Sequence, residues 1–151
     1  MLRRELLGTL GVTAAAALTA VTSGRAFAAS SDDKDDSHGK CAEACFDCEK
    51  ECSEGFHHCF KQVASGKATH AKAMHLCVDC ADICSTSGKL VSRMSPLMAV
   101  TCHACAECCD ICVAECEKTG DAGLKDCCDA LRKCSASCKA MVKAMGGHKG
   151  H

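Results

Sequence analysis

Cysteine is the residue type in this chain whose chemistry and spacing stand out. Eighteen of the 151 residues are cysteines, and within four segments they recur mainly at spacings of three, four or seven. Those spacings place side chains on one face of an α-helix. The four groups are Cys41, Cys45, Cys48, Cys52 and Cys59; Cys77, Cys80 and Cys84; Cys102, Cys105, Cys108, Cys109, Cys112 and Cys116; and Cys127, Cys128, Cys134 and Cys138. Stripes of thiols at this density predict the binding of a soft metal ion.

Cu(I) fits this pattern because it needs only a pair of sulfurs, which Cys-x-x-Cys and Cys-x-x-x-Cys provide on one helix. If each thiolate bridges two coppers and each copper takes two thiolates, the charges cancel and no unpaired charge is buried. Pairs repeat along each stripe, so we expect on the order of ten or more Cu(I) ions per chain. All eighteen cysteines are candidate ligands. Cys108 and Cys128 lie at the margins of their stripes, where inert packing is the alternative.

The sequence is also compatible with other uses of the cysteines. An exported protein can use an even number of cysteines as a disulfide framework, and a thiol redox protein can use Cys-x-x-Cys pairs. Cysteine can also serve as a small apolar core residue. Zinc or iron-sulfur binding is a further alternative, although the ligand spacing and following proline of bacterial ferredoxins are missing. A copper chaperone that carries one ion needs far fewer thiols.

Methionine and histidine add candidate ligands at the two ends of the expected bundle. Met94, Met98, Met141 and Met145 fall at one end, on or beside the inner face, where exchangeable thioether ligands predict an entrance for Cu(I). Their alternative role is to fill the core. At the other end, His70 lies near the inner face and is a candidate ligand, whereas His57 and His58 are expected to point outward. The apolar residues expected to close this end are Phe56, Phe60, Val63 and Leu124.

Four helices must position these side chains. Thr69 and Asp121 are expected to cap the second and fourth helices, Gly88 to end the second, and Pro96 to occupy the first turn of the third. The connections are short, so consecutive helices should pack antiparallel. The sequence therefore predicts an all-α protein, an antiparallel up-down four-helix bundle with a Cys-lined core. Its expected helices span about 37–65, 69–87, 96–119 and 122–146, within a domain of residues 38–147.

The N-terminal segment has the features of a cleavable export signal over residues 1–28. Arg3 and Arg4 precede an apolar run, and Ala26-Phe27-Ala28 is a typical cleavage site. The paired arginines favour the twin-arginine route over ordinary secretion and predict a periplasmic protein. Residues 29–37 are expected to form a flexible leader and residues 148–151 a flexible tail. After cleavage, no membrane association is expected.

Charge and composition exclude other classes of function. The formal net charge is −1, and the chain has no Trp and no Tyr, so nucleic-acid binding has no support. No set of nucleophile, base and orienting residue is visible, and a core full of thiols leaves little room for a substrate. We therefore expect a binding protein and not an enzyme.

The whole cysteine pattern resembles that of the bacterial copper storage proteins. The resemblance runs through Cys41-x3-Cys45-x2-Cys48-x3-Cys52, Cys77-x2-Cys80-x3-Cys84, Cys102-x2-Cys105-x3-Cys109-x2-Cys112-x3-Cys116 and Cys134-x3-Cys138. It implies storage of cuprous ions inside a four-helix bundle and association into homotetramers. The exported branch of the family, which has a twin-arginine signal, is the more similar one. In methane-oxidising bacteria the family implies supply to a copper-dependent membrane monooxygenase, so a copper-dependent recipient enzyme is an expected partner.

Overall fold

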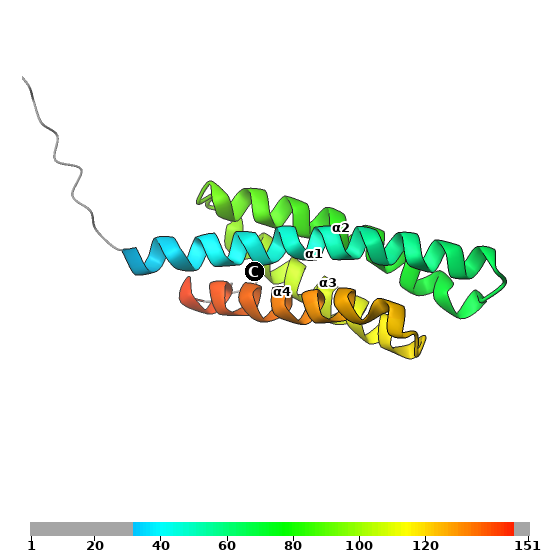
Figure 1. Ribbon diagram of the computed structural model, residues 1–151. Coiled ribbons are helices and arrows are strands. Elements are labelled where there is room, and N and C mark those ends of the chain that lie inside the picture. The colour runs from blue at the N-terminus through cyan, green and yellow to red at the C-terminus, as the bar shows by residue number, and fades with distance from the viewer. Residues whose placement is uncertain (1–31, 147–151) are drawn as a thin grey trace, which may run out of the picture.

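The computed structural model describes residues 32–146, and four α-helices account for most of them. They are α1 (Asp32–Ala64), α2 (Ala71–Ser92), α3 (Met98–Lys118) and α4 (Lys125–Ala144), with short 3-10 helices η1 (Ala68–His70) and η2 (Ala122–Leu124) before α2 and α4 (Figure 1). No strand occurs in this range, which confirms the all-α prediction. None of the helices described is long and apolar enough to cross a membrane.

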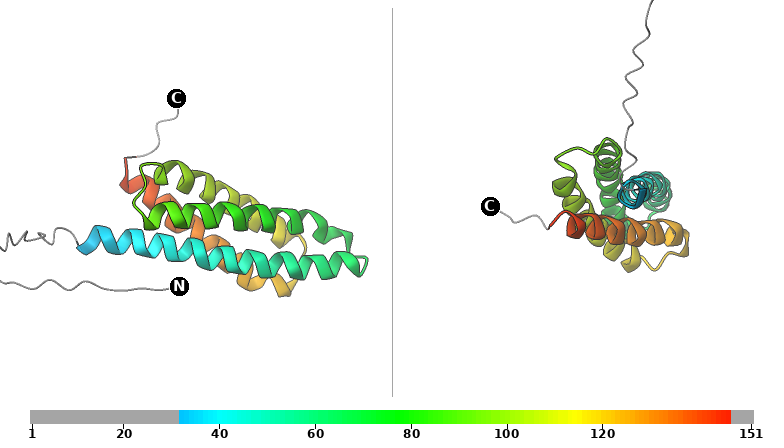
Figure 2. Two further views of the ribbon diagram at one scale, coloured as in Figure 1. Left: turned by 90° about the horizontal axis from the view of Figure 1, so that it is seen from above. Right: turned by 90° about the vertical axis from the view of Figure 1, so that its left-hand side faces the viewer.

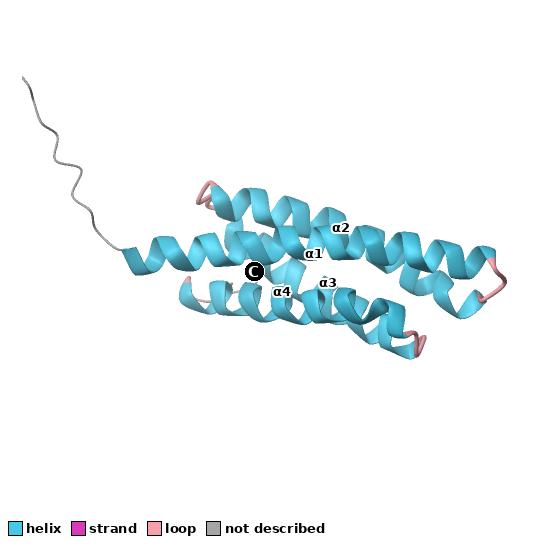
Figure 3. Cartoon of the chain, viewed as in Figure 1, coloured by secondary structure: helices cyan, strands magenta, loops and turns pink. Residues whose placement is uncertain are grey.

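The helices form the predicted up-down bundle. Each helix packs against its neighbours in sequence, and α4 returns to pack against α1. The views along and across the bundle show consecutive helices running in opposite directions (Figure 2). The connections between them lie only at the two ends of the bundle (Figure 3). One end therefore holds the start of α1 and the α2–α3 turn, and the other holds the α1–α2 and α3–α4 turns.

Thiols occupy the position that branched aliphatic side chains hold in most helical bundles. All the cysteines except Cys108 are buried, and alanines such as Ala73 and Ala106 fill positions beside them. The bulky aliphatic side chains that are fully buried are Leu124, Leu131 and Val91. A core so poor in large aliphatic groups buries less apolar area than a leucine core of the same length, so the metal-free bundle has modest hydrophobic stabilisation.

The first helix begins earlier than predicted. It starts at Asp32, inside the segment expected to be a flexible leader, so that expectation is wrong for residues 32–37. The Asp36 carboxylate lies one turn before Lys40 and accepts a hydrogen bond from its ammonium group, and such an i,i+4 pair supports a helix. The predicted end is confirmed, because α1 stops at Ala64 and Gly66 follows with a φ of +93°. Residues 1–28 and 148–151 lie outside the described part of the chain.

Gly88 does not end the second helix, which continues to Ser92. Its role is close approach: a Cβ atom at this position would lie 2.8 Å from Cε1 of Phe46 on α1, nearer than real Cβ contacts allow. The glycine therefore lets the Phe46 ring rest directly on the backbone of α2. Sequence patterning cannot distinguish this use of glycine from a helix stop, since both place Gly after a run of helix-forming residues.

The starts of α2 and α3 also differ from the prediction. Thr69 does not cap α2, because its hydroxyl lies 3.3 Å from Nδ1 of His70 and η1 precedes the helix. Pro96 lies in a turn before α3, and the Met98 N–H donates to the carbonyl of Ser95. Asp121 does act as a cap, since its carboxylate accepts from the Gly123 N–H at the start of η2.

Candidate metal centre

The core sulfurs approach one another along the length of the bundle. Contacts join thiols from different helices, such as Cys45 to Cys138, with 3.6 Å between the two sulfurs, and Cys77 to Cys116, at 3.7 Å. Near the middle, the Cys84 sulfur lies 3.6 Å from that of Cys105. Further sulfur contacts of 3.7–4.0 Å join Cys48 with Cys52 and Cys109, Cys80 with Cys84 and Cys109, Cys84 with Cys109 and Cys134, Cys105 with Cys134, Cys112 with Cys77, Cys127 with Cys52, and Cys134 with Cys45.

These thiols form overlapping groups of three or four whose sulfurs all lie within 4.8 Å of one another. They include Cys41, Cys102 and Cys138; Cys45, Cys105, Cys134 and Cys138; Cys84, Cys105, Cys109 and Cys134; Cys48, Cys80, Cys84 and Cys109; and Cys52, Cys80 and Cys112. Neighbouring groups share members, and Cys84 and Cys134, for example, each belong to two. A shared sulfur can bridge two metal ions, so the arrangement supports a continuous metal-thiolate cluster.

The spacing of the sulfurs suits a bound metal ion. Metal-thiolate bonds are about 2.3 Å long, so two sulfurs on one ion are separated by roughly 3.8 Å in a tetrahedral site and 4.6 Å in a linear one. The observed contacts of 3.6 Å between Cys84 and Cys105 and 3.8 Å between Cys134 and Cys45 are close to the lower value. Ions can therefore enter with small movements of side chains and without unfolding a helix.

Thiols are the main polar groups of the metal-free core. Every cysteine is a free thiol, and the other buried polar side chains in the described range are those of His70, Ser87 and Ser135. Burial raises the pKa of Cys59 to about 11. Hydrogen bonds between core thiols raise the pKa of some, such as Cys84 beside Cys105, and lower the pKa of others, such as Cys134. Because the ligand is the thiolate, metal binding must expel protons from this core.

Cys108 and Cys128 differ from the other thiols, as their helical phase predicts. Cys108 is half-buried on α3, and a hydrogen bond with Cys80 lowers the pKa of its thiol. Cys128 is 8% exposed, and burial raises the pKa of its thiol. The charged groups near Cys128 include Arg132 and Glu117, which lie on the surface between α3 and α4. Both cysteines thus lie at the edge of the cluster.

The structure divides the four candidate methionines into two pairs. Met98 and Met141 are 9% and 4% exposed and belong to the core at the end that holds Cys41, Cys102 and Cys138. Met94 and Met145 are 62% and 40% exposed, so their predicted place on or beside the inner face is wrong. Met94 lies in the α2–α3 turn with a φ of +49°, and α2 ends at Ser92, about one helical turn later than predicted. Met145 directly follows Ala144, the last residue of α4.

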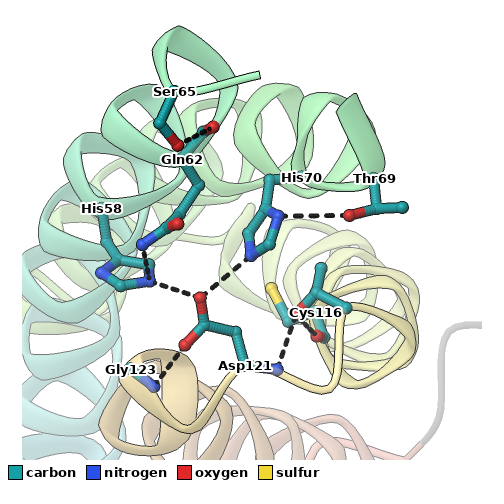
Figure 4. A network of polar contacts seen from close by, with 9 residues as sticks. His58, Gln62, Ser65, Thr69, His70, Cys116, Asp121 and Gly123 are labelled. Carbon is teal, nitrogen blue, oxygen red and sulfur yellow. Dashed lines mark hydrogen bonds and ion pairs between the residues drawn. The ribbon is translucent and has the colours of Figure 1, made fainter. Parts of the chain in front are cut away.

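His70 is buried as predicted, but it contacts a carboxylate and not the thiols. Its Nε2 donates to Oδ2 of Asp121 over 3.0 Å, and the same oxygen accepts from Nε2 of His58 over 2.9 Å (Figure 4). The expectation that His58 points outward is therefore wrong. Hydrogen bonds from His58 and from the Gly123 N–H hold the pKa of the Asp121 carboxyl well below its usual range. A Cβ atom at Gly123 would collide with the His58 ring, so glycine provides its space.

Sequence reasoning missed this cluster because its members come from α1, η1 and the α3–α4 turn. The sequence identifies Asp121, which follows a glycine, as an N-cap residue, but it does not show which side chains contact its carboxylate. Those partners depend on how the ends of the helices meet. The expected apolar closure is formed in part at this end: Leu124 is buried and Phe56 packs against the core. Phe60 is 53% exposed and takes no part in it.

Comparison with known proteins identifies relatives of this chain. The family model described as Csp, copper storage protein, matches residues 34–143. An uncharacterized cysteine-rich protein of Bacillus subtilis (strain 168), YhjQ, is 34% identical over 104 residues, which cover 68% of this chain and 93% of the relative.

Solved structures show the same similarity. The Cu(I)-bound copper storage protein BsCsp3 has a TM-score of 0.62 and 34% identity, covering 67% of this chain and 93% of its own. A cytosolic copper storage protein from Streptomyces lividans, solved with five coppers, has a TM-score of 0.66 at 23% identity, covering 72% of this chain and 94% of its own. At that identity the likeness to the Streptomyces protein shows the fold alone.

Proposed function

Because the chain belongs to the copper storage protein family, we propose that it stores its copper as Cu(I), held by the thiolates of the bundle core. The observation that carries this proposal is the overlap of the sulfur groups, in which one thiol, such as Cys84, belongs to two neighbouring groups. Thiolates select Cu(I) over harder ions, and shared thiolates let many ions occupy one core with little net charge.

Metal analysis of the protein from copper-grown cells tests this function. We expect copper to exceed zinc and iron by a wide margin, with many copper ions on each chain. Spectroscopy of the copper edge distinguishes Cu(I) from Cu(II) in the same sample. Zinc as the main metal, or copper at about one ion per chain, would contradict storage of Cu(I).

We place the copper entrance at the end of the bundle with Met98 and Met141. These two thioethers lie next to the thiol group of Cys102 and Cys138, one turn away on the same helices. Thioether sulfur is a soft ligand without charge, so it can pass Cu(I) on to a thiolate. Met94 and Met145 lie outside the core at the same end and are exposed enough to meet incoming copper first.

Replacing both Met98 and Met141 by leucine is expected to slow copper uptake by about threefold or more, because two soft ligands are lost while the side-chain volume is kept. The final copper content should stay the same, since the thiols remain. Stopped-flow transfer from a Cu(I) chelator measures the rate. The matched control is Met74→Leu, in the first turn of α2 at the opposite end of the bundle, and this variant should load copper at the wild-type rate. Equal slowing by the control would place the entrance elsewhere.

A role as a binding protein, and not as an enzyme, is part of this proposal. A thiol redox enzyme needs an exposed thiol of low pKa. Here nearly all the thiols are buried in the core, where catalysis on an external disulfide has no access. Cys108 alone combines partial exposure with a lowered pKa, and the partner that lowers it is a core thiol, Cys80.

Export through the twin-arginine route to the periplasm is supported by the sequence of residues 1–28, which precede the family match at residue 34. N-terminal sequencing of the protein from a periplasmic fraction tests it, and the expected first residue is Ala29. Protein found only in the cytoplasm with its N-terminus intact would contradict export.

Association into a homotetramer and delivery of copper to a copper-dependent enzyme complete the proposal. Leu97, just before α3, and Val100 and Ile111 on the outer side of that helix are 58%, 45% and 58% exposed. They offer apolar surface for contact with other copies of the chain. Light scattering of the purified protein gives the number of subunits. A monomer at micromolar concentration would contradict the tetramer and leave the copper chemistry of the single bundle intact.

A further inference from the structure

We propose that His58, His70 and Asp121 form a second metal site, which binds one divalent cation of borderline softness such as Zn²⁺. The site lies at the end of the bundle opposite Met98 and Met141. Its donors are two imidazole nitrogens and a carboxylate oxygen, whereas the copper core offers sulfur (Figure 4). The copper storage proposed above rests on the core thiolates and not on these three residues, so this inference goes beyond the proposed function.

Both imidazole nitrogens already lie against the same carboxylate oxygen. Oδ2 of Asp121 lies 2.9 Å from Nε2 of His58 and 3.0 Å from Nε2 of His70. Ligand atoms about 2.0–2.2 Å from a tetrahedral Zn²⁺ are separated by roughly 3.3–3.6 Å, so the two nitrogen–oxygen gaps need to widen by only about half an ångström. The ion would replace the protons that the two imidazoles now donate to the carboxylate.

The surrounding contacts hold the donors in the orientation that a metal requires. Oδ1 of Asp121 accepts a hydrogen bond of 2.8 Å from the Gly123 N–H, so Oδ2, which the two imidazoles share, is the oxygen that would face the ion. Nδ1 of His70 lies 3.3 Å from the hydroxyl oxygen of Thr69, so an imidazole bound through Nε2 can donate its remaining proton there. Such second contacts to the ligands are typical of metal sites and raise their affinity.

Access and chemistry also agree with a divalent ion. The side chains of His58 and Asp121 are 28% and 20% exposed, whereas that of His70 is 4% exposed, so the site opens to solvent on one side and is anchored on the other. Two imidazoles and one carboxylate are a common donor set for zinc, with water in the fourth position. The carboxylate balances half of the charge of the ion.

The competing role for this cluster is mechanical. Asp121 joins α1 to η1 through hydrogen bonds with His58 and His70, and a cluster with this role alone would have no affinity for metal. The two roles differ in metal content, in the donor atoms around a bound ion and in the effect of replacing the carboxylate by an amide. Asparagine keeps the shape of the side chain but loses the charge that a divalent ion needs.

Zinc binding by the copper-saturated protein tests the proposal. The thiols are first filled with Cu(I) until none reacts with a thiol reagent, and the protein is then dialysed against Zn²⁺. We expect about one Zn²⁺ per chain, with an affinity at least about tenfold lower in Asp121→Asn and in His70→Ala. His75→Ala, which removes an exposed histidine on α2, is the matched control and should bind zinc like wild type. No bound zinc, or undiminished binding in Asp121→Asn, would overturn the site.

Two further measurements keep the result unambiguous. The copper content and circular dichroism of each variant, recorded before zinc is added, show that the bundle is folded and filled; a low copper content at this step would count against copper storage and not against the zinc site. Co²⁺ in place of Zn²⁺ should give visible d–d bands without a sulfur-to-cobalt charge-transfer band. A charge-transfer band would assign the ion to thiols and overturn the proposed donor set.

Discussion

Loading with Cu(I) is expected to raise the melting temperature of the protein by tens of degrees. Each ion that binds only the folded state contributes about 4 kcal/mol at a free concentration one thousand times its dissociation constant. For a domain of this size, 1 kcal/mol shifts the melting temperature by roughly 2–8 °C, so several ions produce a large effect. The starting point is low, because Leu124, Leu131 and Val91 are the only bulky aliphatic side chains fully buried in the described core.

Thermal melts followed by circular dichroism, under anaerobic conditions and at increasing copper content, measure this effect. We expect the midpoint to rise with each addition until the thiols are filled. Addition of a strong Cu(I) chelator should restore the melting temperature of the metal-free protein. A midpoint that stays constant during loading would mean that copper binds the folded and unfolded chains equally, as ions held on surface thiols would.

The second large effect is expected from the thiols at the middle of the bundle. Cys84, Cys105, Cys109 and Cys134 form one of the overlapping groups and connect those on either side. Replacing all four by alanine should lower the copper capacity by about four ions or more, since thiols and Cu(I) match near one to one when each thiolate bridges two ions. The cluster should also divide into two parts that fill independently.

Single substitutions provide the controls for this experiment. Cys128→Ala should change the capacity by about one ion or less, because Cys128 lies at the edge of the cluster beside Arg132 and Glu117. Circular dichroism of the metal-free variants shows whether the cavities left in the core, such as the one at Cys134, prevent folding. If the fourfold variant is folded and still binds as much copper as wild type, the central thiols are not ligands.

The helical phase of the cysteines made most of the core predictable. Side chains such as Cys45 and Cys52 recur at the period of the α-helix, and burial requires such stripes to face one another, so the bundle and its thiol core follow from local sequence. The same phase identified Cys108 and Cys128 as the cysteines at the edge. Antiparallel packing then follows from the short connections.

The features that could not be predicted depend on contacts between distant segments. Gly88 has the local sequence of a helix end, and only the position of the Phe46 ring on α1 explains why α2 continues through it. Met94 lies in the α2–α3 connection as expected, but the direction of its side chain depends on the conformation of that turn, where Met94 has a φ of +49°. The contact of His58 with Asp121 spans 63 positions and depends on where two helix ends meet.

A titration with Cu(I) against a competing chelator of known affinity tests most directly whether the core thiolates store many Cu(I) ions. The protein, kept reduced and free of oxygen, should take copper from the chelator until about ten or more ions are bound to each chain. Its thiols should lose their reactivity in proportion to the copper added. Saturation at one or two Cu(I) per chain, with most thiols still reactive, would contradict storage in the core.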